Sequence, residues 1–531
     1  MSLTTVYFSL GNVCPLPTDP PTQNFTLFWF RFVATDSVNK QPKMADPDKA
    51  ESFKLIDMMS YFFVSRPASG RREGFEYQRV MYFNPETEDS LKQTDITGVA
   101  EAFIGFTENF RKRSSGAIPD EYDHRYIKSK KQLEVYVQVE KGQFILGLGL
   151  NREACDKVSY FVHMASIKAL VIRTYETFRL FYGTLESLFA ISRGHCMQRL
   201  DQFFSHYLSL MRISQIPLID LFSGVGFMTL HSIDFLEVQC FVTRIVEKFP
   251  TVCNSVFLYQ DKLVHYTVDK SDISVLYRYL TQHLLRSAVN DELKPDGSMT
   301  VTGKKATEPA EKHLGRFITG VVESIGQELT PESQFPTIYM KKDDGELRRH
   351  SLVVYRSLNA TLCLLVELPE ATEDAPEDTA TEPVDLSALQ AFIDPELSRL
   401  GSTIGDHIPS TTVKVPTGGE LRFHYVYFNP DSLSLKTSFS GSNGISTPMP
   451  PTALYRQVCE TFDHFVDVGT PKFTQVEVKS IDDWWIVVKK ENGRILTLFL
   501  PSIATTTVVD IHENVEQIIK SYFVNLFTAS P

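Results

Sequence analysis

From residue 55 onward, short apolar segments of strand type alternate with longer segments in which apolar residues recur at helical spacing. Residues 61–64 and 77–83 predict two strands of a hairpin, because glycines at positions 70 and 74 lie between them. A helix is expected over 95–110, with Thr94 or Asp95 as its N-cap. Its predicted apolar stripe is Ile96, Val99, Phe103, Phe106 and Phe110.

The pattern continues with two strands at 133–139 and 144–150, joined by a tight turn at Lys141-Gly142. Two helices are predicted next, over 159–182 and 196–212, and Gly183 is a suitable C-cap for the first. This part of the chain therefore has the order strand, strand, helix, strands, helix, helix.

The same order returns twice, which indicates a repeated α+β unit. In the middle of the chain we predict strands at 256–259, 263–267, 316–322, 337–341 and 351–367, with helices at 272–285 and 386–404. In the last part we predict strands at 421–428, 473–478, 484–490 and 495–500, with helices at 453–465 and 514–527.

A four-residue motif accompanies the repeat. Tyr82-Phe83-Asn84-Pro85 recurs as Tyr427-Phe428-Asn429-Pro430, and each copy ends a predicted strand that is followed by a helix. The motif marks equivalent positions of a repeat, or else Asn-Pro simply terminates strands well, since proline cannot continue a ladder.

Composition shifts divide the chain into four segments. Residues 1–52 are predicted to be a flexible N-terminal extension, in which Phe28, Trp29 and Phe30 are an alternative candidate for an interfacial anchor. Three domains follow at 53–245, 251–408 and 418–531. Polar residues at 288–313 and acidic residues at 369–383 predict two mobile linkers within the second domain.

Charge and motif content exclude several functions. The net charge of −12 disfavours nucleic acid as a partner, and seven scattered cysteines without a C-x-x-C pair are typical of a reducing cytosol. The chain has no P-loop, no complete dinucleotide loop, no G-x-S-x-G and no metal-ligand spacing. We therefore expect no cofactor, no metal, no catalytic residues and no enzymatic activity.

Two features suggest binding surfaces. Gly98, Ala102 and Gly105 form a stripe of small residues on one face of the predicted helix at 95–110, and glycine within a helix costs about 1 kcal/mol relative to alanine. This stripe packs either against the domain's own elements or against a partner chain. Trp484 and Trp485 are adjacent on a predicted strand, so their rings point to opposite faces and are possible surface contacts.

Motifs in a fixed order along the chain resemble the Ccz (calcium–caffeine–zinc sensitivity) family of vacuolar-fusion proteins. The resemblance covers about residues 60–527. It is carried by Ser60-Tyr61-Phe62-Phe63, Tyr82-Phe83-Asn84-Pro85, Ala100-Glu101-Ala102-Phe103, Phe203-Phe204-Ser205-His206-Tyr207-Leu208, Asp220-Leu221-Phe222-Ser223-Gly224, Gly315-Arg316-Phe317-Ile318-Thr319-Gly320 and Asp483-Trp484-Trp485-Ile486-Val487-Val488-Lys489-Lys490.

The resemblance implies three longin-like domains, each a five-stranded antiparallel sheet flanked by helices. It implies a subunit of a guanine-nucleotide exchange factor for the late-endosomal Rab GTPase, Rab-seven. The obligate partner would be the Mon (monensin-sensitivity) protein, and a third regulatory subunit is expected. The protein would be cytosolic and recruited peripherally to late endosomes and lysosomes.

The resemblance also directs attention to the first domain as the platform for partner and Rab. We predict that the interface includes Phe83, Asn84 and Pro85, together with the small-residue stripe. The alternative interpretation is a longin-domain trafficking scaffold or tether without exchange activity.

Overall fold

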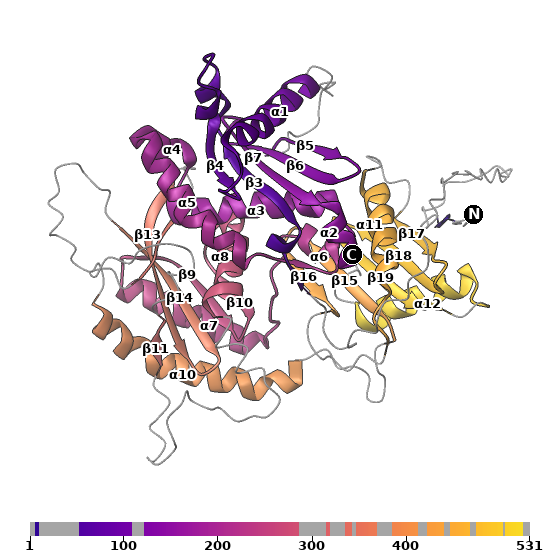
Figure 1. Ribbon diagram of the computed structural model, residues 1–531. Helices are drawn as coiled ribbons and strands as arrows, with labels where there is room; N and C mark the ends of the chain where they lie inside the picture. The colour runs from indigo at the N-terminus through magenta and orange to yellow at the C-terminus, as the bar shows by residue number, and fades with distance from the viewer. Residues whose placement is uncertain are drawn as a thin grey trace, which may run out of the picture. The chain divides into compact units, whose positions relative to one another are not determined.

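The computed structural model describes residues 52–108, 122–285, 315–318, 335–341, 347–368, 385–411, 422–439, 447–467, 474–502 and 505–523, and a short strand at 6–9 (Figure 1). The chain forms two compact units. One comprises Ser52–Lys414, and the other combines Met1–Glu51 with Val415–Pro531. Both units have antiparallel sheets covered by helices, so the predicted α+β class is confirmed.

The first sheet contains five strands in the order β4-β3-β7-β6-β5. Their bounds are β3 (Met59–Ser65), β4 (Val80–Asn84), β5 (His124–Lys128), β6 (Gln132–Val139) and β7 (Phe144–Asn151). Helix α1 (Ser90–Glu108) covers one face, and α3 (Met164–Tyr182) and α5 (Arg193–Leu210) cover the other. Alternation along β3 fixes these faces: Tyr61 and Phe63 share a core with Ala100 of α1, whereas the Phe62 ring lies 4.9 Å from that of Phe204 on α5.

Two glycines of β7 make room for large rings in this core. Gly147 pairs with Phe63 and Gly149 with Tyr61. A Cβ atom at Gly147 would lie 2.2 Å from the Phe63 ring, and one at Gly149 would lie 2.6 Å from the Tyr61 ring. Both rings therefore lie flat over the backbone of β7, and neither glycine position tolerates a side chain without repacking.

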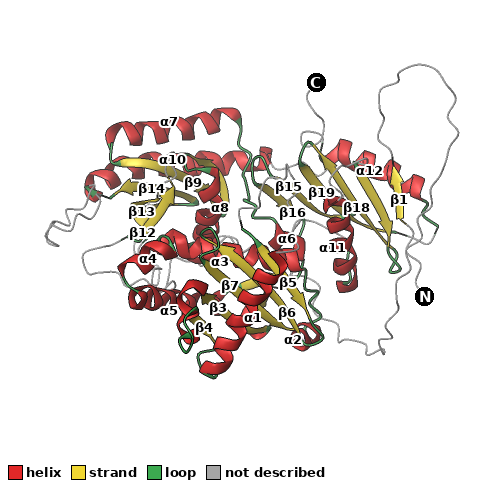
Figure 2. Cartoon of the chain, turned by 90° about the horizontal axis from the view of Figure 1, so that it is seen from above, coloured by secondary structure: helices red, strands yellow, loops and turns green. Residues whose placement is uncertain are grey.

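The second sheet repeats this connectivity in the order β10-β9-β14-β13-β11, with β12 also paired to β13. The strands are β9 (Val252–Tyr259), β10 (Lys262–Tyr266), β11 (Arg316–Phe317), β12 (Thr337–Lys341), β13 (Leu347–Ser357) and β14 (Ala360–Glu367). Figure 2 shows α7 (Ser232–Lys248) and α10 (Leu386–Thr411) on one face of the sheet and α8 (Lys270–Tyr279) on the other. Residues 280–284 extend α8 as a π-helical turn.

The third sheet lies in the other unit and has the order β1-β17-β18-β19-β15-β16. Its strands are β1 (Val6–Ser9), β15 (His424–Asn429), β16 (Ser434–Thr437), β17 (Gln475–Lys479), β18 (Trp484–Glu491) and β19 (Arg494–Pro501). Helices α11 (Thr452–Asp467) and α12 (Val508–Tyr522) pack on it. Apart from β1 and β12, the three sheets share one connectivity, in which the strands counted in chain order stand as 2-1-5-4-3.

Short elements connect these parts. They are the strands β2 (Ser52–Lys54) and β8 (Arg212–Ser214), the helices α2 (Arg152–Lys157), α4 (Leu185–Ile191) and α6 (Pro217–Leu221), and 3-10 turns at Leu55–Asp57, Pro67–Gly70 and Glu76–Arg79. Strands β2 and β8 pair with each other and link the start of the first domain to the segment after α5.

Several element predictions were wrong in detail. The segment at 77–83 begins as a 3-10 turn before β4, and α1 starts at Ser90 instead of Asp95. The single strand predicted at 351–367 is a hairpin of β13 and β14. Helix α7 and the edge strands β5 and β16 were not predicted. Strand β1 lies within the segment that was expected to be flexible, and residues 28–30 and both predicted linkers fall outside the described residues.

The recurring four-residue motif does not mark equivalent positions. Residues 82–85 end β4, which is the second strand of its domain, whereas residues 427–430 end β15, which is the first strand of its own. Strand β16 then intervenes before α11. The structure therefore favours the simpler interpretation, in which Asn-Pro terminates strands in both places.

Buried charges join the first two domains within the larger unit. Helix α3 packs on the first sheet with one side and against α8 and β12 of the second domain with the other. Arg179 of α3 lies 3.8 Å from Asp272 of α8. Asp272 also accepts a hydrogen bond of 2.8 Å from the backbone N–H of Lys341 in β12. These two contacts connect α3 to the second domain, whereas Arg173 of α3 lies 3.8 Å from Asp220 of α6 within the first domain.

Candidate functional site

The outer face of α1 exposes large apolar side chains on the first domain. Leu91, Val99 and Phe106 are 68%, 57% and 62% exposed, and the inward positions of the helix are Thr97, Ala100 and Ile104. Positions 91, 95, 99, 102 and 106 recur at helical spacing, so they form one continuous exposed face. The predicted stripe was therefore wrong for Val99 and Phe106, which face outward, while Phe110 lies outside the described residues.

The two equivalent helices show how unusual this face is within the molecule. Helices α1, α8 and α11 each follow the second strand of their domain. The outer side of α8 is covered by α3, where the rings of Phe181 and Tyr279 lie 4.8 Å apart. The outer side of α11 is polar and carries an exposed ion pair of 2.9 Å between Arg456 and Glu460. Among the described residues of these three helices, α1 is the one that exposes large apolar side chains on its outer face.

The small-residue stripe of α1 has two different environments. A Cβ atom at Gly98 would lie 3.0 Å from Nη1 of Arg79, whereas one at Gly105 would meet nothing within 4 Å. Ala102 is exposed beside them. The structure therefore assigns Gly98 to packing within the chain, and it leaves Ala102 and Gly105 as part of the open face.

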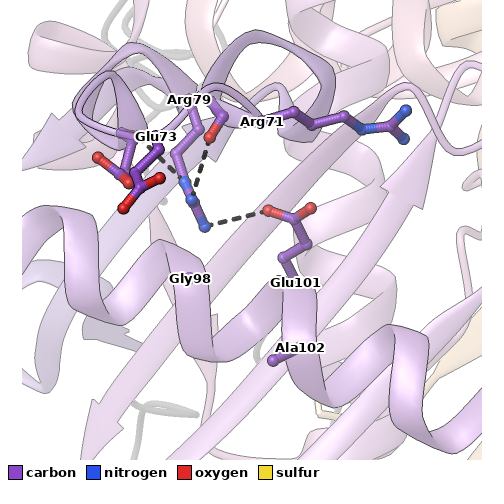
Figure 3. A pocket seen from close by; sticks show the side chains of 8 residues that line it. Arg71, Glu73, Arg79, Gly98, Glu101 and Ala102 are labelled. Carbon is purple, nitrogen blue, oxygen red and sulfur yellow. Dashed lines mark hydrogen bonds and ion pairs between the residues drawn. The ribbon is translucent and has the colours of Figure 1, made fainter.

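Arg79 lies in the connection between β3 and β4 and is hydrogen-bonded to α1, as Figure 3 shows. It donates a hydrogen bond of 3.1 Å to the carboxylate of Glu101, and it also donates to the carbonyl of Glu76 at 3.0 Å. These groups line a surface pocket of about 400 Å³ together with Gly98 and Ala102. The pocket therefore adjoins the apolar face and belongs to the same surface of the first domain.

Single substitutions separate the two glycines. Gly105→Ala is expected to raise the free energy of unfolding by about 1 kcal/mol, because it removes the helix cost of glycine and meets open space. Gly98→Ala is expected to gain less than half as much, because its methyl group crowds the Arg79 guanidinium. Urea unfolding of both variants measures the difference, and a larger gain at Gly98 would contradict this assignment.

The predicted corner is only partly accessible. Asn84 and Pro85 are half-buried at the end of β4 and can contribute to a surface. Phe83 is 5% exposed and packs in the core between the first sheet and α1. Its ring is stacked with that of Phe63 at 6.3 Å. The prediction of Phe83 as a contact residue is therefore corrected, since its side chain is not available to a partner.

The two tryptophans of β18 are also not surface residues. They point to opposite faces of the third sheet, as the strand period requires, but both are buried. Trp485 packs with α12 in the core and donates a hydrogen bond of 3.2 Å to Ser502. The prediction of Trp484 and Trp485 as surface contacts is corrected, because a helix covers each face of this sheet.

No group of three or more His, Cys, Asp or Glu side chains in the described part of the chain could hold a metal ion. Among the helices whose placement is described, none is long and apolar enough to cross a membrane.

Comparisons with known proteins agree with this fold. Residues 59–183 match the family model described as the first longin domain of INTU, CCZ1 and HPS4, and residues 252–394 match Intu longin-like domain 2. The chain is thus an α+β protein with longin-like domains. It is 26% identical to a vacuolar fusion protein CCZ1 homolog of Nematostella vectensis, over 88% of this chain and 97% of that protein.

Other relatives bear the same name. The homolog of Xenopus laevis is 25% identical over 88% of this chain and 96% of its own length, and that of Dictyostelium discoideum is 21% identical over 88% and 98%. The chain is similar to these CCZ1 homologues over 88% of its length, and the resemblance found in its motifs is confirmed.

Proposed function

We propose that this chain is one subunit of a heteromeric guanine-nucleotide exchange factor that activates the late-endosomal and lysosomal Rab GTPase. The relatives are named for vacuolar fusion, which supports a role in membrane trafficking. The finer proposal includes the Mon protein as obligate partner and a third regulatory subunit. Its processes are endosome maturation, autophagy and fusion of vesicles with lysosomes.

The observation that carries the proposal is the exposure of large apolar side chains on the outer face of α1. Leu91, Val99 and Phe106 expose large side chains on a helix whose two counterparts in the same chain are covered or polar. Asp95 lies between Leu91 and Val99 on this face, and Val99, Ala102 and Phe106 follow it without a further charge. Several exposed apolar groups on one helix face are typical of a surface that another protein covers. A second longin-domain chain fits this face, because helix-on-helix packing buries such a row without new backbone hydrogen bonds.

The proposed activity needs no catalytic side chain. An exchange factor binds the nucleotide-free GTPase more tightly than the loaded form, and this difference in affinity favours nucleotide release. The switch segments of the GTPase are then held away from the arrangement that nucleotide phosphate stabilises. Asn84, Pro85 and the pocket beside Arg79 are the candidate polar contacts on the first domain.

Membrane association follows from the assembly in this proposal. The net charge of −12 does not favour anionic lipid, so the chain reaches late endosomes and lysosomes through its complex.

Release of labelled GDP from the late-endosomal Rab tests the proposal. The complex of this chain with the Mon protein is expected to accelerate release at least tenfold, and either chain alone is expected to leave the rate unchanged. A stable complex without any acceleration would reject exchange activity and favour a scaffold or tether.

A further inference from the structure

Strand β1 closes an edge of the third sheet from a distant part of the sequence. In the 2-1-5-4-3 order the third strand is an edge strand, and β17 holds this position in the last domain. Residues 6–9 pair with it antiparallel, with Val6 opposite Val478 and Ser9 opposite Gln475. The sheet therefore contains a strand that lies outside the shared connectivity.

An open edge strand presents unpaired N–H and C=O groups and accepts strands from other chains, so folded proteins cover such edges. Two other sheet edges in this chain are contacted by neighbouring segments. At the outer edge of β10, Met228 donates a backbone hydrogen bond of 2.9 Å to the carbonyl of Leu263. At β4, Arg193 donates to the carbonyl of Val80 at 3.3 Å. The cover of β17 differs, because it comes from a segment more than 400 residues earlier in the chain.

The side chains of β17 are buried and hydrogen-bonded. Gln475, Glu477 and their neighbours in the strand are buried. Glu477 accepts a hydrogen bond of 2.6 Å from the Gln475 side chain and lies 3.0 Å from Nδ1 of His512 on α12. The Glu477 carboxylate therefore lies on the side of the sheet that faces α12. It does not disfavour the addition of a strand at the β17 edge.

We infer that the edge of β17 is a strand-docking site, which residues 6–9 of the same chain occupy in cis. Residues 6–9 thereby close an edge that would otherwise be open to the addition of a strand. The site recognises an extended backbone in antiparallel register, since main-chain hydrogen bonds dominate this mode of binding.

Amide hydrogen exchange tests the inference on the full chain and on the chain lacking residues 1–12. Removal of the strand is expected to accelerate exchange in peptides covering 475–479 at least tenfold, because the cover of that edge is gone. Peptides covering 494–501 in β19, which lies inside the sheet, serve as the control and should stay unchanged. Unchanged exchange at β17 would overturn the inference.

A peptide of residues 1–12 with a fluorescent label completes the test by anisotropy. It is expected to bind the shortened chain saturably and the full chain at least tenfold more weakly. Equal binding to both chains, or binding to neither, would overturn the inference.

If the shortened chain does not fold, cross-linking in the full chain decides. Val6→Cys/Val478→Cys joins opposed positions and should form a disulfide under mild oxidation. The control Val6→Cys/Gln475→Cys is out of register by three residues, or about 10 Å, and should not. Equal yields from the two pairs, or no disulfide in either, would overturn the inference.

Discussion

The double substitution Val99→Glu/Phe106→Glu is expected to abolish the heterodimer with the Mon protein while the chain stays folded. Both side chains are more than half exposed, so glutamate costs little in the free chain. In the complex, two buried charges replace two apolar anchors. A loss of about 2 kcal/mol per anchor weakens binding roughly 1000-fold. Co-purification and titration calorimetry measure the loss.

A matched control distinguishes this face from exposed apolar residues in general. Ile233 and Leu236 of α7 are 60% and 56% exposed, and they lie on the second domain. Ile233→Glu/Leu236→Glu is expected to leave the affinity within about twofold. Thermal unfolding of the α1 variant should remain within about 2 °C of the parent chain, which corresponds to less than about 1 kcal/mol. Intact binding by a folded α1 variant would contradict the account.

Asp220→Ala is expected to lower the free energy of unfolding by about 3–5 kcal/mol, because it leaves Arg173 buried without its counter-ion. Burial raises the pKa of Asp220 and lowers that of Arg173 to about 9, so for both groups desolvation outweighs their mutual attraction. The pair therefore adds little net stability, although removing one partner is costly. Urea unfolding followed by circular dichroism measures the change.

The companion variant Asp220→Ala/Arg173→Leu removes both charges. It is expected to recover part of the loss, since Arg173 is no longer left without a counter-ion, although Arg278 of α8 remains buried at the same place. A loss below about 1 kcal/mol for Asp220→Ala, or no recovery in the double variant, would show that solvent reaches this pair.

The sequence predicted the fold where the periodicity is strong. Apolar runs of β3, β6, β7, β18 and β19 lie in sheet interiors. The turns at Lys141-Gly142 and Asn492-Gly493 have positive φ angles, which glycine and asparagine adopt readily. The missed elements carry weaker patterns. Strands β5 and β16 are edge strands with half-buried residues throughout, so their side chains do not alternate clearly between apolar and polar.

The sequence predicted the helix that carries the candidate site, but it did not predict which face of that helix is exposed. Sequence periodicity identified α1, yet it assigned Val99 and Phe106 to the core, because a helix with apolar residues on two sides has no unique inner face. Thr97 occupies the inner face instead and is fully buried. Its hydroxyl donates a hydrogen bond of 3.0 Å to the Gln93 carbonyl. Buried Phe83 and the two tryptophans show the same limit, since residue type does not reveal whether a helix covers a strand.

Local sequence patterns did not predict the pairing of β1 with β17. Residues 6–8 form an apolar run that is too short to distinguish a strand from an unstructured segment, and a proline-rich stretch begins at Pro15. Only the geometry of the third sheet shows an edge that such a run can occupy. The same holds for the contact of Arg79 with α1, because the pocket that gives Gly98 its role depends on the path of the β3–β4 connection.

The most direct test of the central claim is the rate at which a maleimide labels a cysteine on the outer face of α1. Val99→Cys places the probe on that face, and native Cys240, which is exposed on α7, serves as an internal reference in the same chain. Binding of the Mon protein is predicted to slow labelling at position 99 at least tenfold and to leave Cys240 unchanged. Labelling of position 99 at an equal rate in the free chain and in the stable complex would contradict the account.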